Sequence, residues 1–224
     1  MTNTLHRYGN YENLGGDCIV FAIPCRGYNT DGSVEKLKAF LRLALKHNPV
    51  NMGDGSNGSI FQPSKDLNPS AHWGRRESLH WEEVIEGVEN PGTVAAVFDN
   101  GDAVVNFLEE VRQADLGMSI NISGLVDQAC ECAQAAGITR HSVEYSLGFF
   151  DKHNRLAERR TLELATMCGH GMISPAFAAK MIQMVKENRR TPEQATRTLA
   201  RFCTCGIFNP TRSEQLFEKA KLGG

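Results

Sequence analysis

Short continuous apolar runs and segments of helical periodicity alternate along the first two thirds of the chain. Residues 18–24, CIVFAIP, and residues 93–98, TVAAVF, are typical of strands buried on both faces. A helix capped by Ser33 is expected after the first run, with apolar positions at Val34, Leu37, Phe40, Leu41, Ala44 and Leu45. A second helix is expected after TVAAVF, with apolar positions at Val104, Phe107, Leu108 and Val111.

The pattern continues to residue 150. Residues 118–123, MSINIS, and residues 141–150, HSVEYSLGFF, predict two more strands, with a helix from Leu125 to Ala136 between them. Strands that alternate with helices of this length favour right-handed crossovers and parallel pairing. We therefore predict an α/β domain over residues 1–156, with a mainly parallel sheet and flanking helices.

One segment of this domain, residues 48–76, is dense in Gly, Asn, Ser and Pro. A loop of this length is either a functional flap or a disordered insertion, and the sequence leaves both open. The aromatic, basic and imidazole side chains in and after the flap could close over a small anion, or could form an exposed helix start. These residues are His72, Trp73, Arg75, Arg76, His80 and Trp81.

After Leu156 the pattern becomes helical only. The pairs Ser174-Pro175, Thr191-Pro192 and Asn209-Pro210 each place a capping side chain before a proline at the first helical position. Gln194 completes a capping box with Thr191. Residues 157–224 are therefore expected to form a small all-helical C-terminal lobe.

Two turns of this lobe contain cysteine: MCGHGMIS at residues 167–174 and FCTCGIFNP at residues 202–210. The first is expected to follow a helix that ends at Cys168, where Gly169 can adopt the left-handed conformation. The second is expected to follow the helix that starts at Pro192. Antiparallel packing of the intervening helices could bring the two corners together.

Together the corners would present Cys168, His170, Cys203 and Cys205. Three thiolates and an imidazole form a tetrahedral set for zinc and also suit an iron–sulfur cluster, although common zinc and ferredoxin motifs space their cysteines by at least two residues. Two other interpretations stay open. The side chains could be small apolar groups packed at crowded corners, or Cys203 and Cys205 could form a reversible disulfide while His170 lowers the pKa of Cys168.

A substrate site is expected at the carboxyl ends of the strands, where open parallel sheets bind ligands. The residues that this rule selects are Arg26, Asp99, Asn100, Ser123 and Gly124. Arg26 and a helix start after Gly124 could hold a small anion, although for each residue taken singly a turn or capping role is the better explanation. Cys25 could face the same site, whereas Cys18, Cys130 and Cys132 are expected to pack in the interior.

The composition adds few constraints. The chain has 224 residues, a net charge of −2 and 41% hydrophobic residues. This balance gives no reason to expect nucleic-acid or membrane binding. Seven cysteines without a secretory signal are expected to be reduced in a cytoplasmic protein. The oligomeric state cannot be derived from these patterns.

Common hydrolase, metallopeptidase and dinucleotide motifs are absent from the sequence, and no catalytic residue is identified. The first hypothesis is a metal-binding protein, with zinc or an iron–sulfur cluster, that could act on a small anion at the strand ends. The alternatives are a non-catalytic interaction module with a structural Cys/His site, and a thiol redox protein that uses Cys203 and Cys205.

Overall fold

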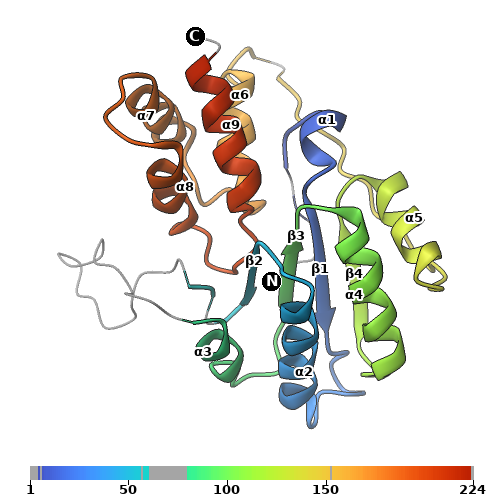
Figure 1. Cartoon of the computed structure of the whole chain (residues 1–224). Helices are drawn as coiled ribbons and strands as arrows, with labels where there is room; N and C mark the ends of the chain where they lie inside the picture. Colours follow the sequence, from blue (N-terminus) through green and yellow to red (C-terminus); the bar gives the residue numbers. More distant parts are fainter. Residues whose placement is uncertain (1–4, 6, 57, 61–79, 152, 223–224) are drawn as a thin grey trace.

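The computed structural model describes residues 5, 7–56, 58–60, 80–151 and 153–222. Four strands lie in one sheet: β1 (Cys18–Ile23), β2 (Asn51–Asp54), β3 (Val94–Phe98) and β4 (Ser119–Ser123). Their spatial order is β2-β3-β1-β4, as Figure 1 shows. Every pair of neighbouring strands is antiparallel.

The prediction of a mainly parallel sheet is therefore wrong. The strand–helix–strand units do exist, but β3 lies between β1 and β2, and β1 lies between β3 and β4. Two units interleaved in this way make every neighbouring pair antiparallel, which is the split β-α-β arrangement of ferredoxin-like topologies. A topology of this kind supports many unrelated functions and identifies none.

Both faces of the sheet are covered. Side chains alternate between faces along a strand, so Val20 and Ala96 face one layer of helices while Phe21 and Val97 face another. Double coverage explains the continuous apolar runs, which occur more commonly in parallel sheets.

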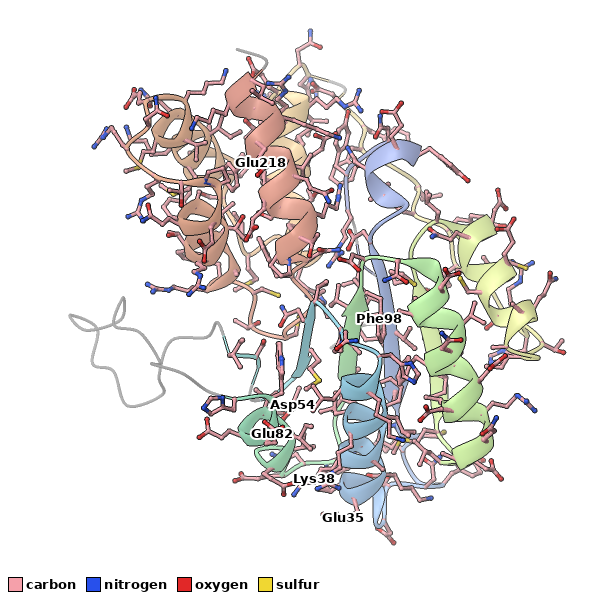
Figure 2. The ribbon with its side chains drawn as sticks, viewed as in Figure 1. Glu35, Lys38, Asp54, Glu82, Phe98 and Glu218 are labelled. Carbon is pink, nitrogen blue, oxygen red and sulfur yellow. The ribbon has the colours of Figure 1, made fainter. Side chains whose placement is uncertain are left out.

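The first layer consists of α2 (Ser33–Lys46) and α4 (Gly101–Ala114), with α3 (Trp81–Glu86) beside α2 and α5 (Val126–Ala135) beside α4. Phe107 joins this layer to the sheet, because its ring centroid lies 5.0 Å from that of Phe40 and 5.2 Å from that of Phe98. Figure 2 shows Phe98 at the end of β3, beside α4. Figure 2 also shows Lys38 on α2, whose ammonium lies 3.1 Å from the Glu86 carboxylate at the end of α3.

The second layer is the predicted helical lobe. It contains α6 (Arg159–Ala165), the 3-10 turn η2 (Thr166–Cys168), α7 (Pro175–Lys186), α8 (Pro192–Ala200) and α9 (Pro210–Leu222). Ser174, Thr191 and Asn209 cap their helices as predicted, and Thr191 and Gln194 form the predicted capping box. The short helix α1 (Tyr11–Leu14) precedes β1.

Other local predictions fail. Gly32 rather than Ser33 precedes α2, and residues 141–150 form no strand. Within the predicted flap, residues 51–54 form β2. The remainder of the flap falls mainly on residues 61–79, outside the described residues, as do His72, Trp73, Arg75 and Arg76. Among the described helices, none is both long enough and apolar enough to cross a bilayer.

A buried ion network fixes the lobe to the sheet. The Asp17 carboxylate, immediately before β1, accepts hydrogen bonds from Arg7 and, at 3.0 Å, from Arg212 of α9. The Asn209 amide also donates to Asp17 at 3.0 Å and to the Gly16 carbonyl at 2.9 Å. The side chains of Arg7, Asp17 and Arg212 are 7%, 0% and 2% exposed, so this network is inside the molecule.

The charges of the two arginines decide the protonation of Asp17. Burial by itself would raise the pKa of this carboxyl, but Arg7 and Arg212 outweigh burial and hold the pKa below its ordinary value. A lowered pKa in the folded state contributes stability above the unfolded-state pKa of about 3.9, and that contribution is lost as the pH falls through the folded-state pKa.

We predict that Asp17→Asn lowers the free energy of unfolding at pH 7 by about 3–5 kcal/mol, because it leaves two buried guanidinium groups without their carboxylate. The difference from the wild type should begin to shrink below about pH 4, where the carboxyl of the unfolded wild type becomes protonated, and should shrink further as the pH falls through the lower folded-state pKa. Denaturant unfolding at both pH values measures it. Asp31→Asn, at an exposed position, is the matched control, and an equal loss in both variants would contradict the role of Asp17.

Candidate functional site

The corner between α8 and α9 contains Cys203 and Cys205. After α8 ends at Ala200, the Cys203 N–H donates to the Ala200 carbonyl, and the chain turns through Gly206 at φ +74°. A Cβ on Gly206 would lie 2.7 Å from the Gly53 Cα on β2. The corner therefore lies directly against the backbone of the β2 edge, at a distance that only glycine allows on both sides.

The corner between α6 and α7 contains Cys168 and His170. Gly169 ends the turn η2 in the left-handed conformation at φ +70°, as predicted. The chain then folds back, and the Met172 N–H donates to the Cys168 sulfur at 3.2 Å. This contact directs a backbone donor at a buried thiol.

The lobe brings the two corners together. The Cys205 sulfur lies 3.5 Å from Nδ1 of His170, and it also lies 3.9 Å from the Cys203 sulfur. Cys168 is close enough for its charge to affect the ionisation of Cys205. The sequence left open whether the corners would meet, and the packing of the lobe brings Cys205 to His170.

The three thiols are buried. Cys168, Cys203 and Cys205 are 0%, 2% and 4% exposed, and His170 is half-buried at the rim. All three sulfurs belong to the same apolar cluster as Ile207 and Phe208. A charged thiolate in such surroundings needs local stabilisation.

The turns provide that stabilisation at Cys203. A hydrogen bond from the Cys205 thiol, together with backbone N–H groups of Cys205 and Ile207 and the charge of Arg7, outweighs burial and lowers the pKa of Cys203 to about 6. The pKa of Cys205 is raised instead, first because its thiol donates a hydrogen bond to Cys203 and second because it is buried. The pair therefore favours a single negative charge shared through one proton.

The donors do not form a complete metal centre as they lie. Among the described residues, no three His, Cys, Asp or Glu side chains are arranged around one point so as to hold a metal ion. The measured contacts instead make a chain from Cys203 through Cys205 to His170.

The residues predicted for a substrate site are divided between the two ends of the sheet. Cys18 of β1 pairs with Phe98 and Ile19 pairs with Ser123, so Asp99 and Gly124 lie where β1 begins. Arg26 follows the other end of β1 and is exposed. The anion site that combined Arg26 with Ser123 and Gly124 is therefore not assembled, because β1 is antiparallel to both neighbours.

Two of the other residues predicted for the substrate site, Asp99 and Asn100, lie at the start of helix α4. Asn100 caps α4, since its Oδ1 accepts the Ala103 N–H at 2.8 Å, and its amide donates to Asp99 at 3.3 Å. Leu125 separates Gly124 from the first residue of α5. Capping and turn roles explain the placement of these residues.

The other cysteines lie outside the Cys/His corner. Cys18 is buried in the core, and burial raises its pKa. Cys132 is buried with its thiol directed at the Gly101 carbonyl at 3.8 Å, while Cys130 is half-buried. Cys25 is exposed beyond β1. In the flap region, His80 and Trp81 form the start of α3, where Glu83 accepts the His80 backbone N–H.

Sequence reasoning missed Arg7, which lies next to the Cys/His corner. Arg7 donates to the Ile207 carbonyl, directly after the Cys203–Gly206 turn, and to Asp17. A single arginine near the N-terminus has no local pattern that reports a partner 200 residues away. Only the folded arrangement identifies it.

Comparison with known proteins gives no family: no protein-family description, curated protein or solved structure matches this chain. Function therefore has to be inferred from the residues themselves.

We predict that Gly206→Ala lowers the free energy of unfolding by about 2–5 kcal/mol, from the left-handed conformation together with the contact against Gly53. Gly27→Ala is the control, because Gly27 has φ +83° but a Cβ there would meet no described atom within 4 Å beyond its chain neighbours. The control should lose only about 1–2 kcal/mol. Equal losses in chemical denaturation would show that the close approach of the corner to β2 does not constrain the fold.

Proposed function

We propose that the Cys/His corner binds one zinc ion through Cys168, His170, Cys203 and Cys205, and that this ion fastens the helical lobe at the β2 edge. The observation that carries the proposal is that two sequence-distant, glycine-flanked corners put Cys203, Cys205 and His170 side by side, with the buried Cys168 near enough to affect Cys205. Backbone N–H groups directed at Cys168 and Cys203 favour thiolates, the form that binds metal.

The measured separations favour a single ion. Tetrahedral zinc with Zn–S near 2.3 Å and Zn–N near 2.05 Å holds two sulfurs about 3.8 Å apart and a sulfur and nitrogen about 3.6 Å apart. The corresponding distances here are 3.9 Å between Cys203 and Cys205 and 3.5 Å between Cys205 and His170. Binding would have to draw Cys168 and the other donors around one centre.

A [4Fe–4S] cluster agrees less well with these distances. In such a cluster each cysteine binds a different iron, and the cluster itself keeps the sulfurs well apart. Adjacent sulfurs 3.9 Å apart are instead typical of two ligands on one metal ion. The choice of zinc over a [4Fe–4S] cluster rests on this difference, whereas a [2Fe–2S] cluster also places two thiolates on one iron and is distinguished by its iron content.

The proposed site is structural rather than catalytic. Three thiolates and an imidazole fill the four positions of tetrahedral zinc and leave none for a substrate. The sulfurs are also almost fully buried. The proposal thus favours the non-catalytic hypothesis, in which the site supports the fold and the outer surface is free to contact a partner protein.

We predict about one zinc per chain in protein purified without oxygen or chelator, measured by elemental analysis. Cys168→Ser and Cys203→Ser should each lose most of this zinc and unfold more readily, because the binding energy of a structural zinc is also folding energy. Cys25→Ser, which changes an exposed thiol, should retain the metal.

Three outcomes would contradict the proposal. Wild-type protein without metal, or unchanged zinc in every cysteine variant, would exclude the site. Two to four irons per chain with an absorbing chromophore would replace zinc by a cluster.

A second candidate function is thiol redox chemistry, which is favoured by the lowered pKa of Cys203 beside Cys205. Oxidised glutathione would accept two electrons from the pair as a disulfide forms between the two sulfurs, and would leave as two glutathione thiols. The metal-free protein would then lose two of its seven free thiols, counted after denaturation, and dithiothreitol would restore them. Seven thiols before and after treatment would exclude this function.

A further inference from the structure

Leu5 and residues 7–10 contact both halves of the proposed zinc site. Leu5 packs so closely on Gly169 that a Cβ there would lie 2.7 Å from the Leu5 side chain. The Tyr8 N–H donates to Thr166 Oγ1 at 2.8 Å, just before Cys168. Between these contacts, Arg7 reaches the other corner and donates to the Ile207 carbonyl.

Ile207 is well placed to transmit an effect of Arg7 to the sulfurs. Ile207 directly follows the Cys203–Gly206 turn, and it is buried in the same apolar cluster as Cys203 and Cys205. Its carbonyl is held by a guanidinium that is only 7% exposed and is itself anchored on Asp17. Residues that orient ligands in this way usually tune metal affinity.

Arg7 also brings a positive charge to the corner. Its charge acts on the Cys203 sulfur, whereas Arg212 faces Asp17 and is also affected by the buried Glu163 carboxylate. A zinc ion with three thiolates and a neutral imidazole carries one negative charge. Burying opposite charges close together offsets the cost that each would have alone.

We propose that Arg7 is a positioning residue for the zinc site, holding Ile207 and the Cys203–Gly206 turn while it neutralises the thiolate-rich centre. This inference rests on the proposed function. It goes beyond it by assigning a role in metal affinity to a residue that provides no ligand. Leu5, Arg7 and Tyr8 then connect the N-terminal part of the chain to both corners.

The test measures the zinc dissociation constant of the full-length chain by competition with a chromophoric chelator. We expect Arg7→Met to weaken zinc binding by about 10–100-fold, because outer contacts to ligands typically contribute that much. Arg7→Lys keeps the charge and should recover binding to within about 10-fold of wild type. The cobalt(II)-substituted proteins should also differ, with an altered thiolate-to-cobalt absorption band in Arg7→Met.

Phe107→Leu is the destabilising control, since Phe107 packs on Phe40 and Phe98 in the helical layer on the opposite face of the sheet from the corner. It should destabilise the fold but leave the cobalt spectrum unchanged. Circular dichroism checks that each variant is folded before titration.

The outcomes separate the two proposals. If wild type binds no zinc, the proposed function fails. If wild type binds zinc and Arg7→Met matches it in both affinity and cobalt spectrum, only the role of Arg7 fails. Equal weakening in Phe107→Leu and Arg7→Met, or no recovery in Arg7→Lys, would likewise overturn the role of Arg7, since the effect would then reflect general loss of packing.

Discussion

The Asp17 carboxylate joins three parts of the chain that are distant in sequence. Arg7 reaches it from the N-terminal segment, Arg212 and Asn209 reach it from the start of α9, and Asp17 itself immediately precedes β1. Because both guanidinium groups are almost fully buried, neither can exchange its carboxylate for water without unfolding its surroundings. The position of α9 against the sheet, and therefore of the corner before it, depends on this network.

Double coverage of the sheet has a related consequence. The lobe packs on Ile19, Phe21, Ala95 and Val97. This packing fixes the position of its two corners relative to the sheet. The α8–α9 corner then contacts β2 backbone to backbone at Gly53 and Gly206. This contact holds Cys205 where His170 can reach it from the other corner. The tight turns that bring the sulfurs together are also the source of the backbone N–H groups that face them.

The Cys/His corner and the ion network meet at Arg7. The same guanidinium touches Asp17 and the carbonyl of Ile207, so the electrostatic balance of the interior and the geometry of the thiols are linked. A thiolate-rich centre is well suited to this place, because a positive charge is already present and the local N–H groups are already directed at sulfur.

The local features of this protein were determined by the sequence itself. Ser174, Thr191 and Asn209 start helices, and Gly169 closes a turn, because caps and left-handed glycines act within about four residues. The same signals located both cysteine corners. Apolar runs identified β1 and β3, but the apolar residues of 141–150 misled, since Tyr145, Leu147 and Phe150 are exposed.

Only the tertiary structure decided how these elements combine. A strand–helix–strand pattern in the sequence is the same whether its two strands are neighbours or have another strand between them. The sequence pattern therefore did not specify the antiparallel pairing. That choice separated Arg26 from Ser123 by the length of the sheet. The contacts of Arg7 with Asp17 and Ile207 were equally hidden, because a long-range ion pair depends on the packing of the whole chain and leaves no local periodicity.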